Sequence, residues 1–245
     1  SGSKDKAASG SSEGKSLVVT YYKTSSFPQV EDFMKRAKEE FESTHKGVTI
    51  DLQPVEADAD QYFTKLALMN KSKSKAPDII YEDTFQVMSD AAAGYLLPID
   101  QYVKNWDEWS QYPESSTQGA KGMDGKLYGV PFGTDTRGIY FNKKIFEQAG
   151  LPTDWQPKNW DEILSAARTI KEKVPDVTPL NIYAGRAGGE QTTMQGFEML
   201  LYGTQDTLYN TDTNKWISGS QGFKDALTFY QTAYSEGLAP SNDVA

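Results

Sequence analysis

The sequence has no cysteine and a single histidine, His45. The lack of cysteine excludes disulfide bonds and thiol catalysis, and one histidine leaves few nitrogen ligands for a transition metal. No apolar run approaches the roughly 20 residues that a membrane-spanning helix needs. We therefore predict no metal site and no cofactor.

An excess of basic residues is also lacking, because 25 lysines and arginines face 34 aspartates and glutamates, for a net charge of −9. This acidity argues against nucleic acid or an anionic membrane as the main partner. The chain has 245 residues, of which 38% are hydrophobic. Such a chain can build one large or two modest domains with packed cores.

The first 16 residues, SGSKDKAASGSSEGKS, are small and polar and show no periodic pattern. This composition predicts a flexible N-terminal tether over residues 1–16. The alternative is that some of these residues are left over from expression.

Strand and helix signals alternate along the next part of the chain. Short β-rich runs predict strands at 17–22, 48–55 and 78–81, and apolar residues at helical spacing predict a helix after each of them. This order predicts a parallel sheet with helices on both faces. We assign residues 17–132 to a first α/β lobe.

In parallel sheets of this kind a ligand lies beyond the carboxyl ends of the strands. The polar residues at those ends are Tyr22, Ser25 and Ser26 after the first strand, and Glu82 and Asp83 after the third. We predict that these five bind a ligand. Two alternatives stay open: Tyr22 could be a core aromatic residue, and the two carboxylates could cap the following helix.

Four aromatic residues, Tyr102, Trp106, Trp109 and Tyr112, recur at helical spacing in a polar background. One interpretation is a platform for a sugar. The spacing favours the half-buried face of a helix.

The segment 125–151 is predicted to form a strand, a polar loop, a second strand and a short helix capped by Asn142. Its loop, 133–137, is predicted to cross between two lobes. Thr134, Asp135 and Arg137 would then face a cleft. The alternative is a surface connection between neighbouring strands.

Residues 138–245 are assigned to a second, incomplete α/β lobe. Asn159 and Glu162 predict the start of a helix, and Leu180–Tyr183 predicts a short strand. The glycine-rich stretch that follows lacks the lysine and glycine spacing of a phosphate-binding loop. We predict that it forms a cleft wall with Arg186 and Gln195 as hydrogen-bond donors, and an ordinary flexible loop is the alternative.

Three motifs occur in a fixed order: GKLYGVPF at 125–132, IYFNKKIFEQAGL at 139–151 and NWDEILSAARTIK at 159–171. Together they resemble the signature of family 1 extracellular solute-binding proteins, the carbohydrate receptors of bacterial ABC importers. One position departs from the pattern, because Phe141 stands where tyrosine is usual before the Asn-Lys pair.

The resemblance implies a two-lobed periplasmic-binding-protein-like α/β fold with a hinge. It also implies a receptor that captures an oligosaccharide between its lobes and delivers it to the permease subunits of an ABC importer. We expect a monomer at the extracellular face of the membrane, lipid-anchored in a Gram-positive bacterium, or a periplasmic protein. Family members are considerably longer, so the second half of the pattern is missing from this sequence.

Two other functions compete with an oligosaccharide receptor. The same fold could bind a non-sugar solute such as a peptide, an amino acid or a polyamine. A glycoside hydrolase would need two carboxylates on either side of one bond, whereas neighbours such as Glu82 and Asp83 point to opposite faces of an extended chain. We therefore predict a binding protein and no enzyme.

Overall fold

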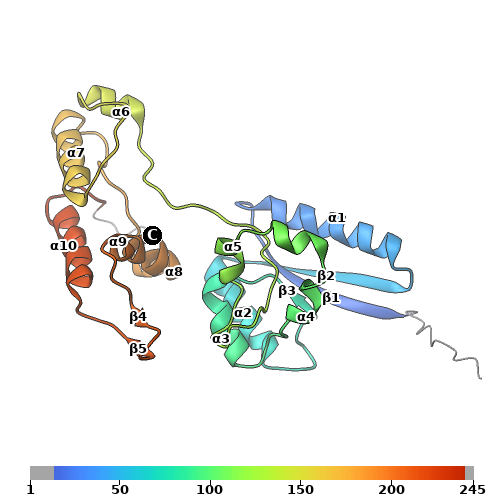
Figure 1. Cartoon of the computed structure of the whole chain (residues 1–245). Coiled ribbons are helices and arrows are strands. Elements are labelled where there is room, and N and C mark those ends of the chain that lie inside the picture. Colours follow the sequence, from blue (N-terminus) through green and yellow to red (C-terminus); the bar gives the residue numbers. More distant parts are fainter. Residues whose placement is uncertain (1–13, 241–245) are drawn as a thin grey trace, which may run out of the picture. The chain divides into compact units, whose positions relative to one another are not determined.

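A computed structural model describes residues 14–240, so most of the predicted tether and residues 241–245 of the predicted second lobe lie outside the described residues. The chain divides into two compact units between Thr134 and Asp135 (Figure 1). The predicted crossover at 133–137 contains this division. Its action as a hinge stays a prediction.

Unit 1 is built on a three-stranded parallel sheet in the order β2-β1-β3. Strands β1 (Lys15–Lys23) and β2 (Val48–Glu56) pair along nine residues each, and β3 (Ile79–Ile80) pairs with Val19 and Thr20. The predicted parallel sheet is confirmed. The first strand starts two residues earlier than expected, and the third is shorter.

The helices α1 (Pro28–Thr44), α2 (Ala59–Asn70) and α3 (Thr84–Ala92) follow the three strands in turn. Tyr21 of β1 interacts with Glu31 of α1, whereas the ring of Tyr22 lies 5.3 Å from that of Tyr62 in α2. Because successive side chains of a strand point to opposite faces, α1 and α2 cover opposite faces of the sheet (Figure 1). This arrangement was predicted.

The helix α2 supplies the centre of the unit 1 core. Tyr62, Phe63 and Leu66 are buried against residues from all three strand ends. The predicted apolar face of α1 is less complete, since only Val30 is buried there and Phe33 remains 45% exposed.

Residues 100–118 do not form the single helix that the aromatic spacing predicts. They form the short helices α4 (Asp100–Val103), η1 (Asp107–Gln111) and α5 (Glu114–Gln118). Pro113 disfavours helical backbone at the preceding residue, and Tyr112 is extended with ψ of 127°. The rings of Trp106, Trp109 and Tyr112 contact one another instead of lining one helix face.

The turn at Asp124-Gly125 connects Lys121 and Leu127, which pair in an isolated antiparallel bridge. Gly125 in this turn has φ of +77°. The strands predicted at 127–130 and 139–141 are absent, because neither segment belongs to a sheet of the described residues. A strand depends on a paired neighbour as well as on its own residues.

Unit 2 is mainly helical. Its principal helices are α6 (Lys143–Gln148), α7 (Trp160–Lys173), α9 (Glu198–Gly203) and α10 (Gln221–Ser235), with a hairpin of β4 (Tyr209–Asn210) and β5 (Lys215–Trp216). The Asn142 and Asn159 side chains accept hydrogen bonds from the first turns of α6 and α7, as predicted. Glu162 accepts from the Lys158 amide.

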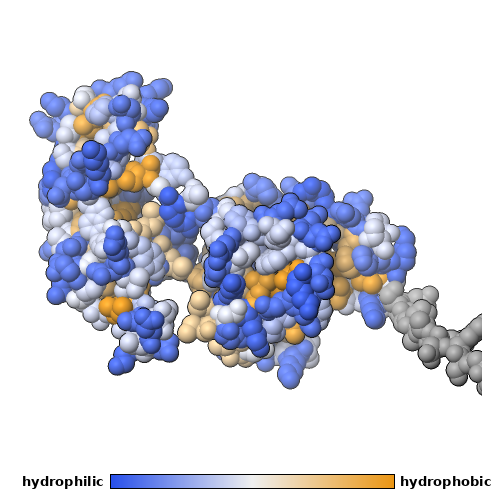
Figure 2. All heavy atoms as spheres, viewed as in Figure 1, coloured by the Kyte–Doolittle hydropathy of each residue, from blue (hydrophilic) through white to orange (hydrophobic). Residues whose placement is uncertain are grey.

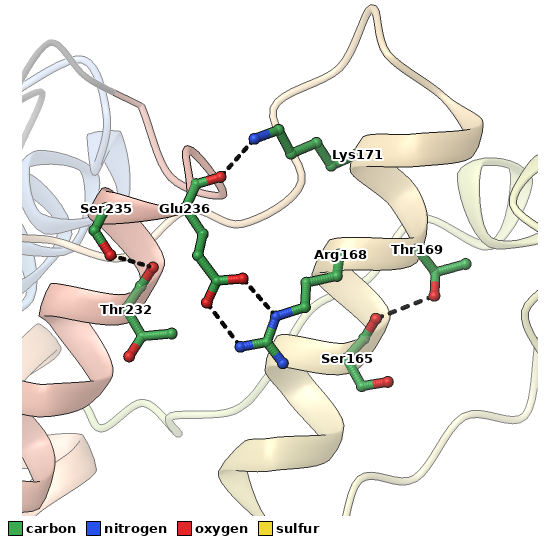
Figure 3. Close-up of polar contacts among 7 residues, drawn as sticks. All are labelled: Ser165, Arg168, Thr169, Lys171, Thr232, Ser235 and Glu236. Carbon is green, nitrogen blue, oxygen red and sulfur yellow. Dashed lines mark hydrogen bonds and ion pairs between the residues drawn. The ribbon is translucent and has the colours of Figure 1, made fainter.

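Helix α7 holds unit 2 together through both of its faces. Leu164 and Ala167 pack with α9 and α10, and Ala166 and Ile170 pack with α6. At the surface, Arg168 donates two hydrogen bonds of 2.7 and 2.8 Å to the Glu236 carboxylate, just after α10 (Figure 3).

The region 180–197 lacks the predicted strand and has a helical glycine-rich stretch. Leu180–Tyr183 is not a strand, although the Leu180 amide donates to the Leu238 carbonyl. The glycine-rich stretch forms η2 (Arg186–Gly188), α8 (Glu190–Thr192) and the π-helical turn η3 (Thr193–Phe197). A Cβ on Gly196 would lie 2.3 Å from the Tyr183 carbonyl oxygen, so this turn packs too closely for any side chain.

Candidate ligand-binding site

The carboxyl ends of β1 and β3 lie at the same edge of unit 1, because the two strands are parallel neighbours. The Tyr81 amide donates to the Thr20 carbonyl at 2.9 Å and so holds the start of the Glu82-Asp83 segment beside β1. Ser25 and Ser26 form an exposed turn after β1. We call this region the carboxyl edge of unit 1.

Aromatic rings surround the carboxyl edge. Tyr62 lies 5.3 Å from Tyr22 and 6.5 Å from Tyr81, measured between ring centroids, and its hydroxyl donates to the Tyr81 carbonyl. Phe132 meets the rings of Tyr81 and Phe33 edge-on. Tyr22 is therefore half-buried in an aromatic cluster and also stands at the strand end.

Sequence reasoning did not select Phe33, Tyr81 or Phe132 as site residues. A signal was present for two of them. Tyr81 immediately precedes the Glu82-Asp83 pair, and Phe132 ends the GKLYGVPF motif just before the crossover.

Glu82 is half-buried, and its Oε1 atom has no solvent contact and no hydrogen-bond partner. Burial first, and then the neighbouring Asp90 carboxyl, raise the pKa of Glu82 to about 9. Both causes disfavour the charged form. The neutral form of the Glu82 carboxyl group is thereby favoured, and that form can donate as well as accept hydrogen bonds.

Asp83 occupies the position before α3, but its side chain makes no hydrogen bond to the amides of that helix. Its Oδ1 accepts a hydrogen bond from the Thr84 hydroxyl at 3.3 Å. The capping role considered for this residue is therefore wrong. The carboxylate is exposed at the carboxyl edge.

Thr134, Asp135 and Arg137 lie on an exposed, extended segment. Arg137 Nη1 lies 2.6 Å from Asp135 Oδ2. Exposed ion pairs contribute little stability, so this pair can exchange its partners for a ligand at small cost.

In unit 2, Arg186 begins η2 and is exposed, whereas Gln195 lies half-buried in the π-helical turn. The Gln195 amide nitrogen is 3.4 and 3.3 Å from the two Glu190 carboxylate oxygens. Burial, followed by Glu190, raises the pKa of Glu198 nearby. π-Helical turns are frequent at functional sites, which agrees with a binding role for this region.

Two hollows within the units involve other residues. In unit 1 a groove of about 530 Å³ runs between α2 and α3 and is lined by Phe63, Leu68 and Phe85 among others. In unit 2 a hollow of about 240 Å³ is bordered by α7, residues 139–142 and residues 177–181. None of the predicted site residues lines either one. Figure 2 shows hydrophobic residues at the surface of both units within mainly hydrophilic faces.

The sequence profile of bacterial extracellular solute-binding proteins matches residues 25–244. This chain belongs to that family. The predicted resemblance is thereby confirmed. No helix among residues 14–240 is long and apolar enough to cross a membrane.

Individual relatives agree with this assignment. A protein of Brucella abortus (strain 2308), whose name describes it as a binding protein, is 27% identical over 224 residues, which cover 91% of this chain and 50% of the relative. The solute-binding protein of an ABC transporter from Thermotoga lettingae, solved with α-D-tagatose, has a TM-score of 0.72 at 25% identity. This match covers 94% of this chain and 56% of the Thermotoga chain. A cyclic α-maltosyl-1,6-maltose binding protein from Arthrobacter globiformis has a TM-score of 0.66 at 21% identity. This match covers 93% of this chain and 56% of the Arthrobacter chain.

These structures confirm the predicted periplasmic-binding-protein-like α/β fold. The chain spans about half the length of the relatives it matches, in line with the prediction that part of the family pattern is missing. The family is one of binding proteins.

Proposed function

We propose that this chain is part of the substrate-binding receptor of a bacterial ABC importer and captures an oligosaccharide between two lobes without altering it. The observation that carries the proposal is the carboxyl edge of unit 1, where exposed aromatic rings stand beside Glu82 and Asp83 in a chain of the solute-binding family. The α-D-tagatose and maltosyl-maltose ligands of the two solved relatives support a sugar.

The residue types at this edge fit the chemistry of sugars. A sugar ring offers flat apolar faces, which aromatic rings bind, and hydroxyl groups, which need convergent donors and acceptors. Phe132 is 44% exposed and can offer a ring face. Ser25, Ser26, Glu82 and Asp83 can bond hydroxyls from the first lobe.

The second lobe and the crossover would complete the site. We assign hydrogen bonds to ligand hydroxyls to Thr134, Asp135, Arg137, Arg186 and Gln195. Closure about the segment 133–137 would bring them to the ligand, as in the hinge-bending of periplasmic binding proteins.

The other partners follow from the same proposal. The closed receptor would dock as a monomer on permease subunits at the extracellular face of the membrane. A lipid anchor in a Gram-positive bacterium, or a periplasmic location, completes the proposal. Binding without chemical change is favoured because Glu82 and Asp83 are adjacent in the chain and do not form the opposed carboxylate pair of a glycoside hydrolase.

Isothermal calorimetry tests the ligand class. Purified chain is titrated with a panel of oligosaccharides, monosaccharides, amino acids, short peptides and polyamines. We expect heat of binding from oligosaccharides. Phe132→Ala should weaken that binding roughly threefold to tenfold, because one stacked aromatic ring contributes about 0.5–1.5 kcal/mol beyond its buried area.

The matched control is Trp216→Ala. Trp216 is 80% exposed in the unit 2 hairpin, outside the predicted site. Its loss should leave affinity unchanged. Binding of amino acids, peptides or polyamines in place of sugars contradicts the oligosaccharide assignment, and equal losses in the two variants contradict the role of the carboxyl edge.

A further inference from the structure

The starts of β1, β2 and β3 lie at one edge of the sheet of unit 1, opposite the carboxyl edge, because the strands are parallel. The Lys15 amide donates to the carbonyl of the residue just before β2 at 3.2 Å, and the Asp78 amide, just before β3, donates to the Val18 carbonyl at 2.9 Å. The turns that lead into β2 and β3 are therefore held beside the start of β1. We call residues 14–16, 45–47 and 71–78 the amino edge of unit 1.

The amino edge is basic, although the chain as a whole carries a net charge of −9. Apart from His45, its ionisable side chains are lysines and a single aspartate, Asp78. The Asp78 carboxylate is engaged within the fold, because it accepts a hydrogen bond of 2.8 Å from the Val18 amide. The lysines are all exposed, and they are Lys15, Lys46, Lys71, Lys73 and Lys75.

Three of these lysines alternate with serines in residues 71–75, which we call the lysine turn. The amides of Lys75 and Ala76 donate to the Ser72 carbonyl at 2.9 and 2.8 Å, and the hydroxyls of Ser72 and Ser74 lie 3.1 Å apart. The backbone and the serines thus fold the turn on itself. Its three lysine side chains are presented to the solvent.

Other lysines of unit 1 are paired with carboxylates. Lys23 and Lys35 lie 3.4 and 3.2 Å from Glu31, and Lys38 lies 3.2 Å from Glu42. No lysine of the lysine turn has such a partner within residues 14–240. Neighbouring like charges without a counter-charge attract an external anionic surface.

The place of the amino edge in the fold selects the kind of anionic surface. The predicted tether leads directly into β1, so an anchor ahead of it would join unit 1 at this edge. The carboxyl edge lies at the other end of β1, nine residues away, or roughly 30 Å at 3.3 Å per residue. A contact at the amino edge therefore leaves the candidate ligand site of unit 1 free.

We propose that the amino edge of unit 1 rests on the anionic headgroups of a membrane and holds the carboxyl edge of the unit away from them. The inference rests on the proposed function, through its N-terminal lipid anchor. Basic clusters next to an anchor are attracted to anionic lipids within about one Debye length. Acidic residues farther away are screened, so the net charge of the chain does not oppose this contact, which adds to the main partners.

Vesicle binding tests the proposal on the purified chain without a lipid anchor. Vesicles of phosphatidylcholine with about 30% phosphatidylglycerol are compared with pure phosphatidylcholine in about 0.02 M salt, where screening is weak. We expect the chain to cosediment with the anionic vesicles only. The partition coefficient should fall roughly tenfold or more in the combined variant Lys71→Gln, Lys73→Gln, Lys75→Gln.

The matched control is the combined variant Lys143→Gln, Lys144→Gln, Lys158→Gln. It removes three exposed lysines from unit 2 and changes the net charge by the same amount. Its vesicle binding should stay within about twofold of the wild type, since these lysines lie outside the amino edge. Circular dichroism establishes that both variants are folded.

Two results overturn the proposal: the wild-type chain ignores the anionic vesicles, or the two variants lose binding equally. Retention on poly-L-glutamate without vesicle binding also overturns it and assigns the amino edge to an acidic protein surface. Calorimetry with oligosaccharides separates this inference from the proposed function. If vesicles bind and no solute does, the receptor fails and the amino edge stands, whereas solute binding without vesicle binding contradicts the membrane contact alone.

Discussion

The two units support their candidate site residues in different ways. In unit 1, Tyr22 and Glu82 stand at the ends of strands that a parallel ladder of backbone hydrogen bonds fixes in register. In unit 2, Arg186 and Gln195 stand on short helical turns, and Phe197 at the end of η3 packs into the core that contains α10. The described part of unit 2 has no ladder longer than the two-residue hairpin.

This difference has a consequence for the sensitivity of the two halves of the site. A backbone ladder tolerates many side chains, because its hydrogen bonds do not depend on residue identity. A turn held by packing depends on a few atoms that fit closely. We therefore expect the geometry around Gln195 to be more sensitive to single substitutions than the carboxyl edge of unit 1.

The largest expected effects come from the two cores. Leu66 in α2 and Leu201 in α9 are both fully buried. Replacing either by alanine should lower the free energy of unfolding by about 2–5 kcal/mol, through lost burial and a residual cavity. Leu97→Ala, at a position that is 66% exposed, should change it by much less.

Hydrogen exchange followed by mass spectrometry shows where each loss acts. Leu66→Ala should accelerate exchange in β1, β3 and α2, and Leu201→Ala should do so in α9 and α10. Equal acceleration throughout the chain in both variants would contradict the division into two units.

A smaller effect tests the packed turn directly. A Cβ on Gly196 would meet the Tyr183 carbonyl oxygen at 2.3 Å and the Tyr230 hydroxyl at 2.7 Å, and these two atoms hydrogen-bond to each other. Gly196→Ala should therefore cost about 1–3 kcal/mol, as overpacked sites do. Thermal unfolding measures the change.

Gly203→Ala is the matched control. Gly203 is the last residue of α9, and a Cβ there would meet no atom within 4 Å. Alanine should be neutral or stabilise the helix by up to about 1 kcal/mol. If the two variants unfold alike, close packing does not hold the π-helical turn.

Local signals in the sequence predicted the features that depend on neighbouring residues in the chain. The caps at Asn142 and Asn159 and the alternation of strands and helices in unit 1 were of this kind. The meeting of the ends of β1 and β3 was predicted from that alternation through the general rule for parallel sheets. The resemblance carried the family and the fold. The roles of the ten predicted site residues stay predictions.

Features that depend on distant residues could not be predicted in the same way. Residues 139–141 and 180–183 have strand-like composition, but the described chain offers neither segment a ladder partner. The glycines of 185–196 suggested a loop, whereas Gly196 serves a close approach to the Tyr183 backbone.

The smallest effect concerns the surface link between α7 and the end of α10. The Arg168 guanidinium holds the pKa of the exposed Glu236 carboxyl below its ordinary value. A lowered pKa in the folded state stabilises the fold above the ordinary carboxyl range, and this contribution is lost as the pH falls through the folded-state pKa. Glu236→Gln should therefore lower the melting temperature slightly at pH 7.

The difference between Glu236→Gln and the wild type should shrink as the pH falls through the lowered folded-state pKa of Glu236, because both side chains are then uncharged. It should also shrink in 1 M salt, where exposed pairs are screened. Lys171 still donates to the Glu236 main-chain carbonyl in this variant, so the helix end keeps one link to α7. Glu172→Gln removes the same charge from α7 without touching the Arg168 pair and serves as the control. If the difference between the two variants persists unchanged in acid and in salt, Glu236 acts through packing rather than through charge. Close packing would then stabilise unit 2 at its surface as well as in its interior.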